Sequence, residues 1–111
     1  MIKNAKVRKI TIGDCEYPAF ANVALLMELQ DEGINLDTIM VEEGSQKWRN
    51  FAKLLKKIID KGYQAIGSTE TVSESDILDS IDIASIPGLT DQLAILFGGK
   101  GRTVEAEPPK N

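Results

Sequence analysis

Residues 47–63, KWRNFAKLLKKIIDKGY, separate into an apolar half and a basic half when they are wound as an α-helix. The apolar half carries eight residues: Trp48, Phe51, Ala52, Leu54, Leu55, Ile58, Ile59 and Tyr63. The other half carries five basic residues: Arg49, Lys53, Lys56, Lys57 and Lys61. This periodicity predicts one long helix from Ser45 to about Ile66.

The charge of this segment is opposite to that of the whole protein. From Ser45 to Gly62 there are six Lys or Arg and one Asp, a net charge of +5, while the net charge of the whole protein is −4. Like charges four residues apart cost about 0.2–0.5 kcal/mol per pair in an isolated helix. We therefore expect a compensating acidic surface, either within this chain or on a partner. The five basic residues are candidate partner-binding residues, together with three acidic ones that a neighbouring subunit could offer them: Asp76, Asp79 and Asp82.

Composition limits the classes to which this protein can belong. Its 111 residues, 42% hydrophobic and 27% charged, suit one soluble domain. The acidic pI near 4.8 argues against nucleic-acid binding across the surface. Cys15 is the only cysteine, so a reducing compartment such as the cytoplasm is expected. No apolar run reaches the roughly 18 residues of a membrane span, and no export signal is recognisable.

The N-terminal part predicts a β-hairpin followed by a helix. Residues 5–12 are rich in β-branched side chains, Gly13-Asp14 suits a two-residue turn, and residues 15–17 form a return strand. Pro18 is expected to close the hairpin just ahead of a helix that Gly33 ends. The inward stripe of that helix is expected to contain Phe20, Val23, Ala24 and Met27, with Leu26 at its margin.

The remaining segments predict short helices. A helical turn is expected at 36–42, capped by Asn35, and residues 73–76, SESD, have the form of a capping box before Ile77 and Leu78. A last helix at 86–97 should begin at Ser85, with Pro87 in its first turn. Four of its residues are expected to face inward: Leu89, Leu93, Leu96 and Phe97. The sequence thus predicts an α+β fold, an N-terminal β-hairpin packed on a small bundle of about four helices. Residues 1–97 form its single domain, and 98–111 a flexible polar tail.

Residue types that support catalysis are scarce. The sequence has no histidine, which removes the commonest general base and nitrogen ligand, and a Cys–His pair is impossible. Residues 98–101, GGKG, follow a helix and not a strand, so they do not predict a phosphate-binding loop. Asp76, Asp79 and Asp82 are most simply a solvated face, and Cys15 a half-buried residue. We expect no enzymatic activity, no metal and no cofactor.

Residues 79–82, DSID, resemble the D-S-L-D signature of acyl carrier proteins, in which a serine at a helix start carries a phosphopantetheine arm. The length and acidity of the protein also suit such a carrier. Two features depart from that pattern: Pro87 interrupts the long acidic helix that should follow, and a basic helix precedes the motif. An acyl-carrier-like protein is therefore the alternative hypothesis.

The order of elements resembles the tail assembly chaperones of long non-contractile-tailed bacteriophages and prophages of Gram-positive hosts. The resemblance covers about residues 7–97. It rests on the hairpin ending in Tyr17-Pro18, the pattern F-x-x-x-A-L-L-x-E-L-x-x-x-G at 20–33, and the helices and polar tail that follow. It implies a non-enzymatic protein of the bacterial cytoplasm that keeps the tape measure protein soluble and recruits tail tube protein. Genes of that family often end at a ribosomal slip site, with which Gly98-Gly99-Lys100 is compatible.

The apolar half of 47–63 has more than one possible role. It could bind a helical client in a groove, or it could form the domain core, which leaves the basic face and the tail for function. A helix on a membrane surface is a third option, opposed by the apolar stripes of 19–32 and 86–97, which also need partners. Self-association into a homo-oligomer and a generic protein–protein adaptor also stay open.

Overall fold

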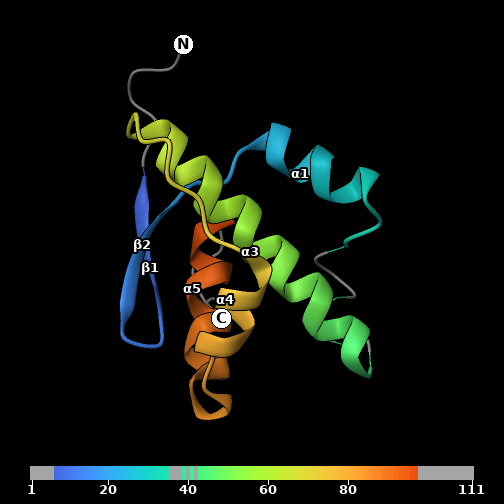
Figure 1. The fold of residues 1–111 in the computed structure, drawn as a ribbon. Helices are drawn as coiled ribbons and strands as arrows, with labels where there is room; N and C mark the ends of the chain where they lie inside the picture. The colour runs from blue at the N-terminus through green and yellow to red at the C-terminus, as the bar shows by residue number, and fades with distance from the viewer. Residues whose placement is uncertain (1–6, 36–38, 40, 42, 98–111) are drawn as a thin grey trace, which may run out of the picture.

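The long helix α3 (Ser45–Ala65) crosses the molecule, and the other elements pack along it (Figure 1). The computed structural model describes residues 7–35, 39, 41 and 43–97. A β-hairpin lies on one side of α3 and helix α1 (Val23–Asp31) on the other, with α4 (Glu74–Ser80) and α5 (Ile86–Leu96) beside its middle. A short 3-10 helix, η1 (Ile83–Ser85), joins α4 to α5. The predicted α+β class, a hairpin on a small set of helices, is confirmed.

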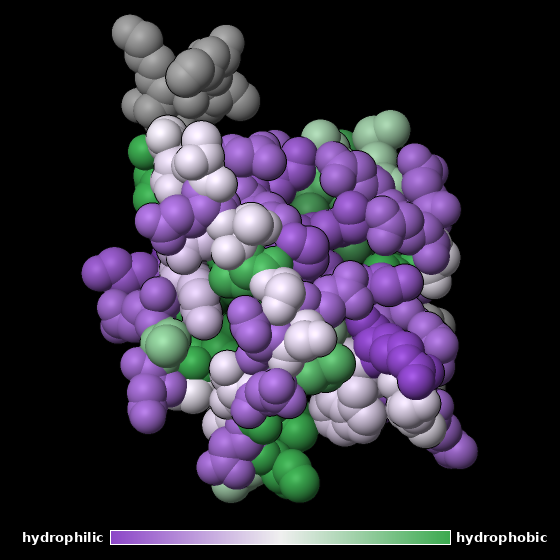
Figure 2. Space-filling model, in the orientation of Figure 1, coloured by the Kyte–Doolittle hydropathy of each residue, from purple (hydrophilic) through white to green (hydrophobic). Residues whose placement is uncertain are grey.

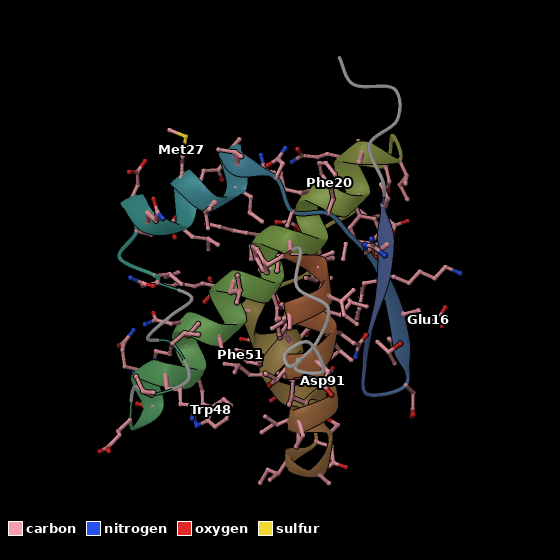
Figure 3. All side chains as sticks on the ribbon, turned by 180° about the vertical axis from the view of Figure 1, so that it is seen from behind. Glu16, Phe20, Met27, Trp48, Phe51 and Asp91 are labelled. Atoms are coloured by element: carbon pink, nitrogen blue, oxygen red, sulfur yellow. The ribbon has the colours of Figure 1, made fainter. Side chains whose placement is uncertain are left out.

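Helix α3 supplies the centre of the core, as its periodicity predicts. Six residues of its apolar half are at most 1% exposed: Phe51, Ala52, Leu54, Leu55, Ile58 and Ile59. Trp48 and Tyr63, near the ends of this face, are partly buried, and the rings of Trp48 and Phe51 meet edge to face at 6.0 Å (Figure 3). Most of the apolar half of α3 is therefore core and is not available as a docking surface.

Gly62, also buried on α3, marks the closest approach of the hairpin to the helix. A Cβ atom at this position would collide with the backbone carbonyl group of Pro18. Nearby, the N–H of Phe20 donates to the carbonyl oxygen of Ile58 at 3.1 Å. The second strand thus meets α3 backbone to backbone, which requires a residue without a side chain.

The hairpin consists of β1 (Arg8–Ile12) and β2 (Cys15–Ala19), with Gly13-Asp14 as the predicted two-residue turn and φ of 62° at Gly13. The expected end of the return strand is wrong, because β2 continues through Pro18 to Ala19. In a hairpin with a two-residue turn, the pair of residues next to the turn is hydrogen-bonded, and the following pairs are alternately non-hydrogen-bonded and hydrogen-bonded. Ile12 and Cys15 form the pair next to the turn. The Lys9–Pro18 pair is then a non-hydrogen-bonded one. The ladder does not need the N–H that proline lacks.

Helix α1 begins later and buries a different face than the sequence predicted. Asn22 caps it by accepting from the N–H of Leu25 at 2.9 Å, and Gly33, with φ of 80°, follows its end as expected. The buried residues are Leu25 and Leu29, whereas Val23 and Met27 are 71% and 58% exposed. Residues 23–27 are all apolar, so the helical periodicity of the sequence alone does not show which face of α1 is buried. Contact with α3 decides which face is buried, and the predicted stripe of Val23, Ala24 and Met27 is wrong.

The C-terminal elements follow the predicted helix limits closely. Ser73 caps α4 by accepting from the N–H of Asp76 at 3.0 Å, and Leu89 and Leu93 of α5 are buried. Leu96 and Phe97 are only partly buried. Ser85 precedes α5 but forms no side-chain cap, because its Oγ donates to the carbonyl oxygen of Asp82.

The predicted tail at 98–111 and most of the helical turn at 36–42 lie outside the described residues. Within that turn, Ile39 is buried and its N–H donates to the Asn35 carbonyl at 2.9 Å.

Candidate partner-binding surfaces

Two of the five basic candidate residues, Lys57 and Lys61, form ion pairs with α1. Lys57 Nζ lies 2.9 Å from Glu32 Oε2 and 3.5 Å from Glu28 Oε1, and Lys61 Nζ lies 3.2 Å from Glu28 Oε2. The hydrogen bond and positive charge of Lys61 lower the pKa of the Glu28 carboxyl. The hydrogen bond with Glu32 raises the pKa of Lys57. For this half of the basic face, the compensating acidic surface lies within the same protein.

Lys56, on α3, binds the segment that precedes α4. Its Nζ lies 3.0 Å from Asp60 Oδ2, 3.1 Å from Thr71 Oγ1 and 2.8 Å from the Val72 carbonyl oxygen. The Thr71 hydroxyl in turn donates to Asp60 Oδ1 at 2.6 Å. An ammonium group has three donors, so these three acceptors use its full capacity. Lys56 therefore has a structural role here.

The N-terminal half of the basic face consists of Arg49 and Lys53. Arg49 is exposed and its Nη1 donates to Ser45 Oγ at 3.0 Å, and Lys53 is half-buried. In the part of the protein that the structure describes, neither residue has an ion-pair partner. Arg49 and Lys53 are thus the members of the predicted basic face that remain available to an acidic partner.

The three acidic candidates are exposed but do not share one helical face. Asp76 and Asp79 lie on α4, whereas Asp82 follows the end of that helix and caps η1, accepting from the N–H of Ala84 at 3.4 Å. The ion pairs of the described residues do not join any of the three to the basic candidates within the molecule.

Ser80, the serine of the carrier-like motif, ends helix α4. Its Oγ donates to the carbonyl oxygen of Asp76 at 2.7 Å, one turn earlier in the same helix. The carrier signature places its serine at the start of a helix. The local structure around Ser80 therefore differs from the one that this resemblance implied.

Three adjoining grooves, two of them apolar and the third of mixed character, meet at the C-terminal turn of α5, and sequence reasoning missed them. The first, of about 200 Å³, lies between α3 and α5 and includes Leu54, Leu93 and Phe97. The second, of about 320 Å³, lies between the start of α1 and the end of α5. The third, of about 400 Å³, lies beside β1. Leu96 lines the second and third grooves and Phe97 the first and second, so together they form one surface, which we call the α5 surface.

Exposed apolar side chains extend the α5 surface. Val23, on α1, lines the second groove, and Ile95, 46% exposed, lines the third. Met27, one turn after Val23, points away from the body of the molecule (Figure 3). Seen from this side, α5 lies between α1 and the hairpin (Figure 3). Single exposed apolar residues are ordinary, but a continuous group of them marks an interaction surface.

The opposite face is mostly polar (Figure 2). Apolar side chains are scattered among the polar ones on this face, and one group of them lies at the end of the molecule where η1 lies. There Ile83 is 83% exposed. Ile83 precedes α5, whereas the α5 surface surrounds the other end of that helix. The two apolar regions are therefore separate.

A side chain from α5 closes part of the outer edge of β1. Gln92 Oε1 accepts from the N–H of Thr11 at 2.9 Å, and Gln92 Nε2 donates to the Thr11 carbonyl oxygen at 3.3 Å. One carboxamide thus satisfies both backbone groups that a third strand would otherwise bind. The two residues are 81 positions apart, and no local sequence pattern predicts the contact.

The protein has one thiol and two phenols, and all three lie within the described residues. Cys15 is exposed, not half-buried as expected, because it lies directly after the hairpin turn. Burial raises the pKa of Tyr17 and of Tyr63 above the ordinary value of 10.0. Among residues 7–35, 39, 41 and 43–97, no group of three or more His, Cys, Asp or Glu side chains is placed to hold a metal ion.

Comparison with known proteins yields no relative: no family model, curated protein or solved structure matches the sequence or the fold. Within the described residues, no helix combines the length and the apolar character that crossing a membrane requires.

Proposed function

We propose that this protein is a non-enzymatic tail assembly chaperone of a long non-contractile-tailed bacteriophage or prophage. In this role it binds the tape measure protein in the bacterial cytoplasm and recruits tail tube protein around it. The proposal rests on the resemblance in element order over residues 7–97 and on one structural observation, the α5 surface.

The α5 surface suits a helical client because it offers grooves bordered by exposed apolar side chains. An amphipathic helix binds such a groove through apolar residues spaced three and four apart. Val23 lines the second groove and Ile95 the third, and Leu96 of α5 lines both grooves, so a client helix that lies across the C-terminal turn of α5 would cover Val23 and Ile95. The proposal therefore assigns binding to α1 and α5, because the apolar half of α3 is used by the core.

Co-expression with the tape measure protein of the same phage or prophage, followed by affinity purification, tests the proposal. The wild-type protein should keep the client soluble and retain it. Val23→Asp combined with Ile95→Asp should reduce the retained client at least tenfold. Ile83→Asp is the matched control, because it places the same charge on an exposed apolar residue outside the α5 surface.

Equal retention by the double variant would move the binding site elsewhere, and a client that stays insoluble with the wild-type protein would refute the chaperone role. The melting temperature of each variant, measured alongside, separates lost binding from lost folding.

The alternative function, an acyl-carrier-like protein, has a direct test of its own. Incubation with a phosphopantetheinyl transferase and coenzyme A should leave the mass of the protein unchanged. A mass gain that maps to Ser80 would favour the carrier over the chaperone.

A further inference from the structure

The outer edge of β1 offers backbone hydrogen-bonding groups beside a groove. Ile12, Ile10 and Arg8 direct their N–H and C=O groups toward β2, so Thr11 and Lys9 direct theirs outward. Gln92 occupies both outward groups of Thr11. Among the described residues, Lys9 has no corresponding backbone partner. Its side chain alone is engaged, at 3.8 Å from Glu16.

The third groove, of about 400 Å³, adjoins this open part of the edge. Ile10, Ile95 and Leu96 contribute apolar side chains to its lining. Arg8 and Lys9 also line it, and none of the described residues that line it carries a carboxylate, although the net charge of the whole protein is −4. An open strand edge next to a groove is the geometry of strand addition, in which backbone hydrogen bonds give affinity and alternate side chains give specificity.

We propose that the β1 edge at Lys9 is a strand-addition site for an extended segment of another protein in which apolar and acidic side chains alternate. The segment pairs with the N–H and C=O of Lys9 and stops at Gln92, which already occupies the next outward position. One of its apolar side chains enters the groove against Ile95 and Leu96. Its carboxylates then lie on the opposite face of the strand pair, beside the side chain of Lys9.

The charges select this occupant over a second copy of β1. Pairing of two β1 edges would bring Arg8 and Lys9 of each copy against the same cations, and like charges across a strand pair are unfavourable. Lysine on an exposed edge is a common means of preventing such self-pairing. The inference does not depend on the chaperone proposal, because it concerns an extended segment and its test needs no tape measure protein.

A peptide titration followed by NMR tests the site on the full-length protein. The probe is a blocked hexapeptide of alternating valine and glutamate, and its control carries lysine in place of glutamate. With the glutamate peptide, the Lys9 amide resonance should shift saturably, and its hydrogen exchange should slow at least tenfold. The Ile12 amide, which already faces β2, should keep its exchange rate. The lysine peptide should produce no saturable shift.

Two variants at Lys9 separate the backbone groups from the side chain. Lys9→Pro removes the outward N–H, yet it leaves the ladder intact because Lys9 and Pro18 form a non-hydrogen-bonded pair. Followed at the Gln92 side-chain amide, Lys9→Pro should bind at least tenfold more weakly than Lys9→Ala, which keeps the N–H. If Lys9→Pro does not fold, Lys9→Glu carries the test, since it should reverse the preference toward the lysine peptide.

Three results would overturn the inference. One is equal binding by Lys9→Pro and Lys9→Ala, or an unchanged peptide preference in Lys9→Glu. Another is a set of shifts centred on Arg49 and Lys53 in place of Lys9, which would locate the acidic peptide on the basic face. The last is a concentration-dependent shift of Lys9 without peptide, which would make a second copy of this protein the occupant.

Discussion

Gly62 and Gly88 both lie inside helices, but their surroundings give them opposite roles. A Cβ at Gly62 would meet the backbone of Pro18, whereas a Cβ at Gly88 would have no other atom within 4 Å. Alanine is favoured over glycine in a helix by about 1 kcal/mol in the absence of other effects. The atoms next to Gly62 belong to the backbone of β2, so the whole strand must move to make room for a Cβ, whereas a flexible side chain could turn aside.

The two glycines therefore predict stability changes of opposite sign. Gly62→Ala should destabilise the fold by about 1–3 kcal/mol, because β2 must move away from α3. Gly88→Ala should stabilise it by about 0.5–1 kcal/mol. Urea denaturation of both variants measures the difference. A stabilised Gly62→Ala variant would mean that β2 does not rest on α3 as described.

Leu55 tests the assignment of the α3 apolar face to the core. It is fully buried, so Leu55→Ala should cost about 2–5 kcal/mol in unfolding free energy. Met27→Ala also shortens an apolar side chain, but from an exposed position, and should change stability by less than about 0.5 kcal/mol. Thermal and chemical denaturation of both variants provide the measurement. Unchanged stability with lost partner binding in Leu55→Ala would show instead that this face is a docking surface.

At the scale of elements, α1 is attached to α3 in two ways. Leu25 and Leu29 supply the apolar contact, and Glu28 and Glu32 pair with Lys57 and Lys61 along its border. Glutamates four residues apart on one helix match lysines four residues apart on the other, which is a signal that the sequence contained. The α1 pattern was ambiguous because residues 23–27 are apolar on every side, so the position of these glutamates was the better guide to its buried face.

The ion pairs predict a pH dependence of the attachment. The folded-state pKa of Glu28 lies below its ordinary value of 4.5, because Lys61 and Lys57 favour the charged carboxylate. Its stabilising contribution is therefore present above pH 4.5 and is lost as the pH falls below that value through the folded-state pKa. Glu28→Gln should lower the melting temperature at pH 7, and the difference from wild type should shrink in acid and in high salt.

Asp31→Asn is the matched control for Glu28→Gln. Asp31 lies on the same helix and, within the described part of the protein, takes part in no ion pair. Calorimetry from pH 7 to pH 3 compares the two variants. Parallel pH profiles for wild type and Glu28→Gln would show that the ion pairs do not contribute in solution.

At the scale of the whole molecule, the elements were predictable and their joint surfaces were not. Strong periodicity identified α3 and its buried face, and turn residues identified the hairpin and the end of α1. The α5 surface combines residues near the N-terminus, at the start of α1 and at the end of α5, each unremarkable in its own segment. The continuation of β2 past Pro18 was not predicted, because a strand tolerates a proline only where pairing does not need its N–H. Whether Pro18 meets this condition depends on the register with β1, which the sequence does not show.

The basic face predicts self-association that depends on salt. We assign this self-association to Arg49 and Lys53, which form no ion pair within the described residues. Arg49 and Lys53 remain available to acidic residues of a neighbouring copy, with Asp76, Asp79 and Asp82 as the candidates. Attraction between exposed charges is screened over about 8–10 Å at physiological salt, so association should weaken as salt rises. Arg49→Glu with Lys53→Glu should weaken it further in sedimentation experiments across a salt series.

Arg8→Glu with Lys9→Glu makes the same change in net charge on the hairpin and is the control for this experiment. Association should persist in that variant if the α3 face is responsible. A protein that is monomeric at every salt concentration would identify the basic face as a solvated surface.

The contact between Gln92 and Thr11 also bears on the order in which the protein is synthesised. The hairpin leaves the ribosome first, but the helix that covers β2 follows about 40 residues later, and Gln92 follows Thr11 by 81 residues. At roughly 5–20 residues per second, Gln92 is added about 4–16 s after Thr11. During that interval the β1 edge at Thr11 is open to strands of other proteins, whereas the β2 side is open only until α3 has been added. The edge at Thr11 is therefore closed by a residue added late in translation, and not by the formation of the hairpin itself.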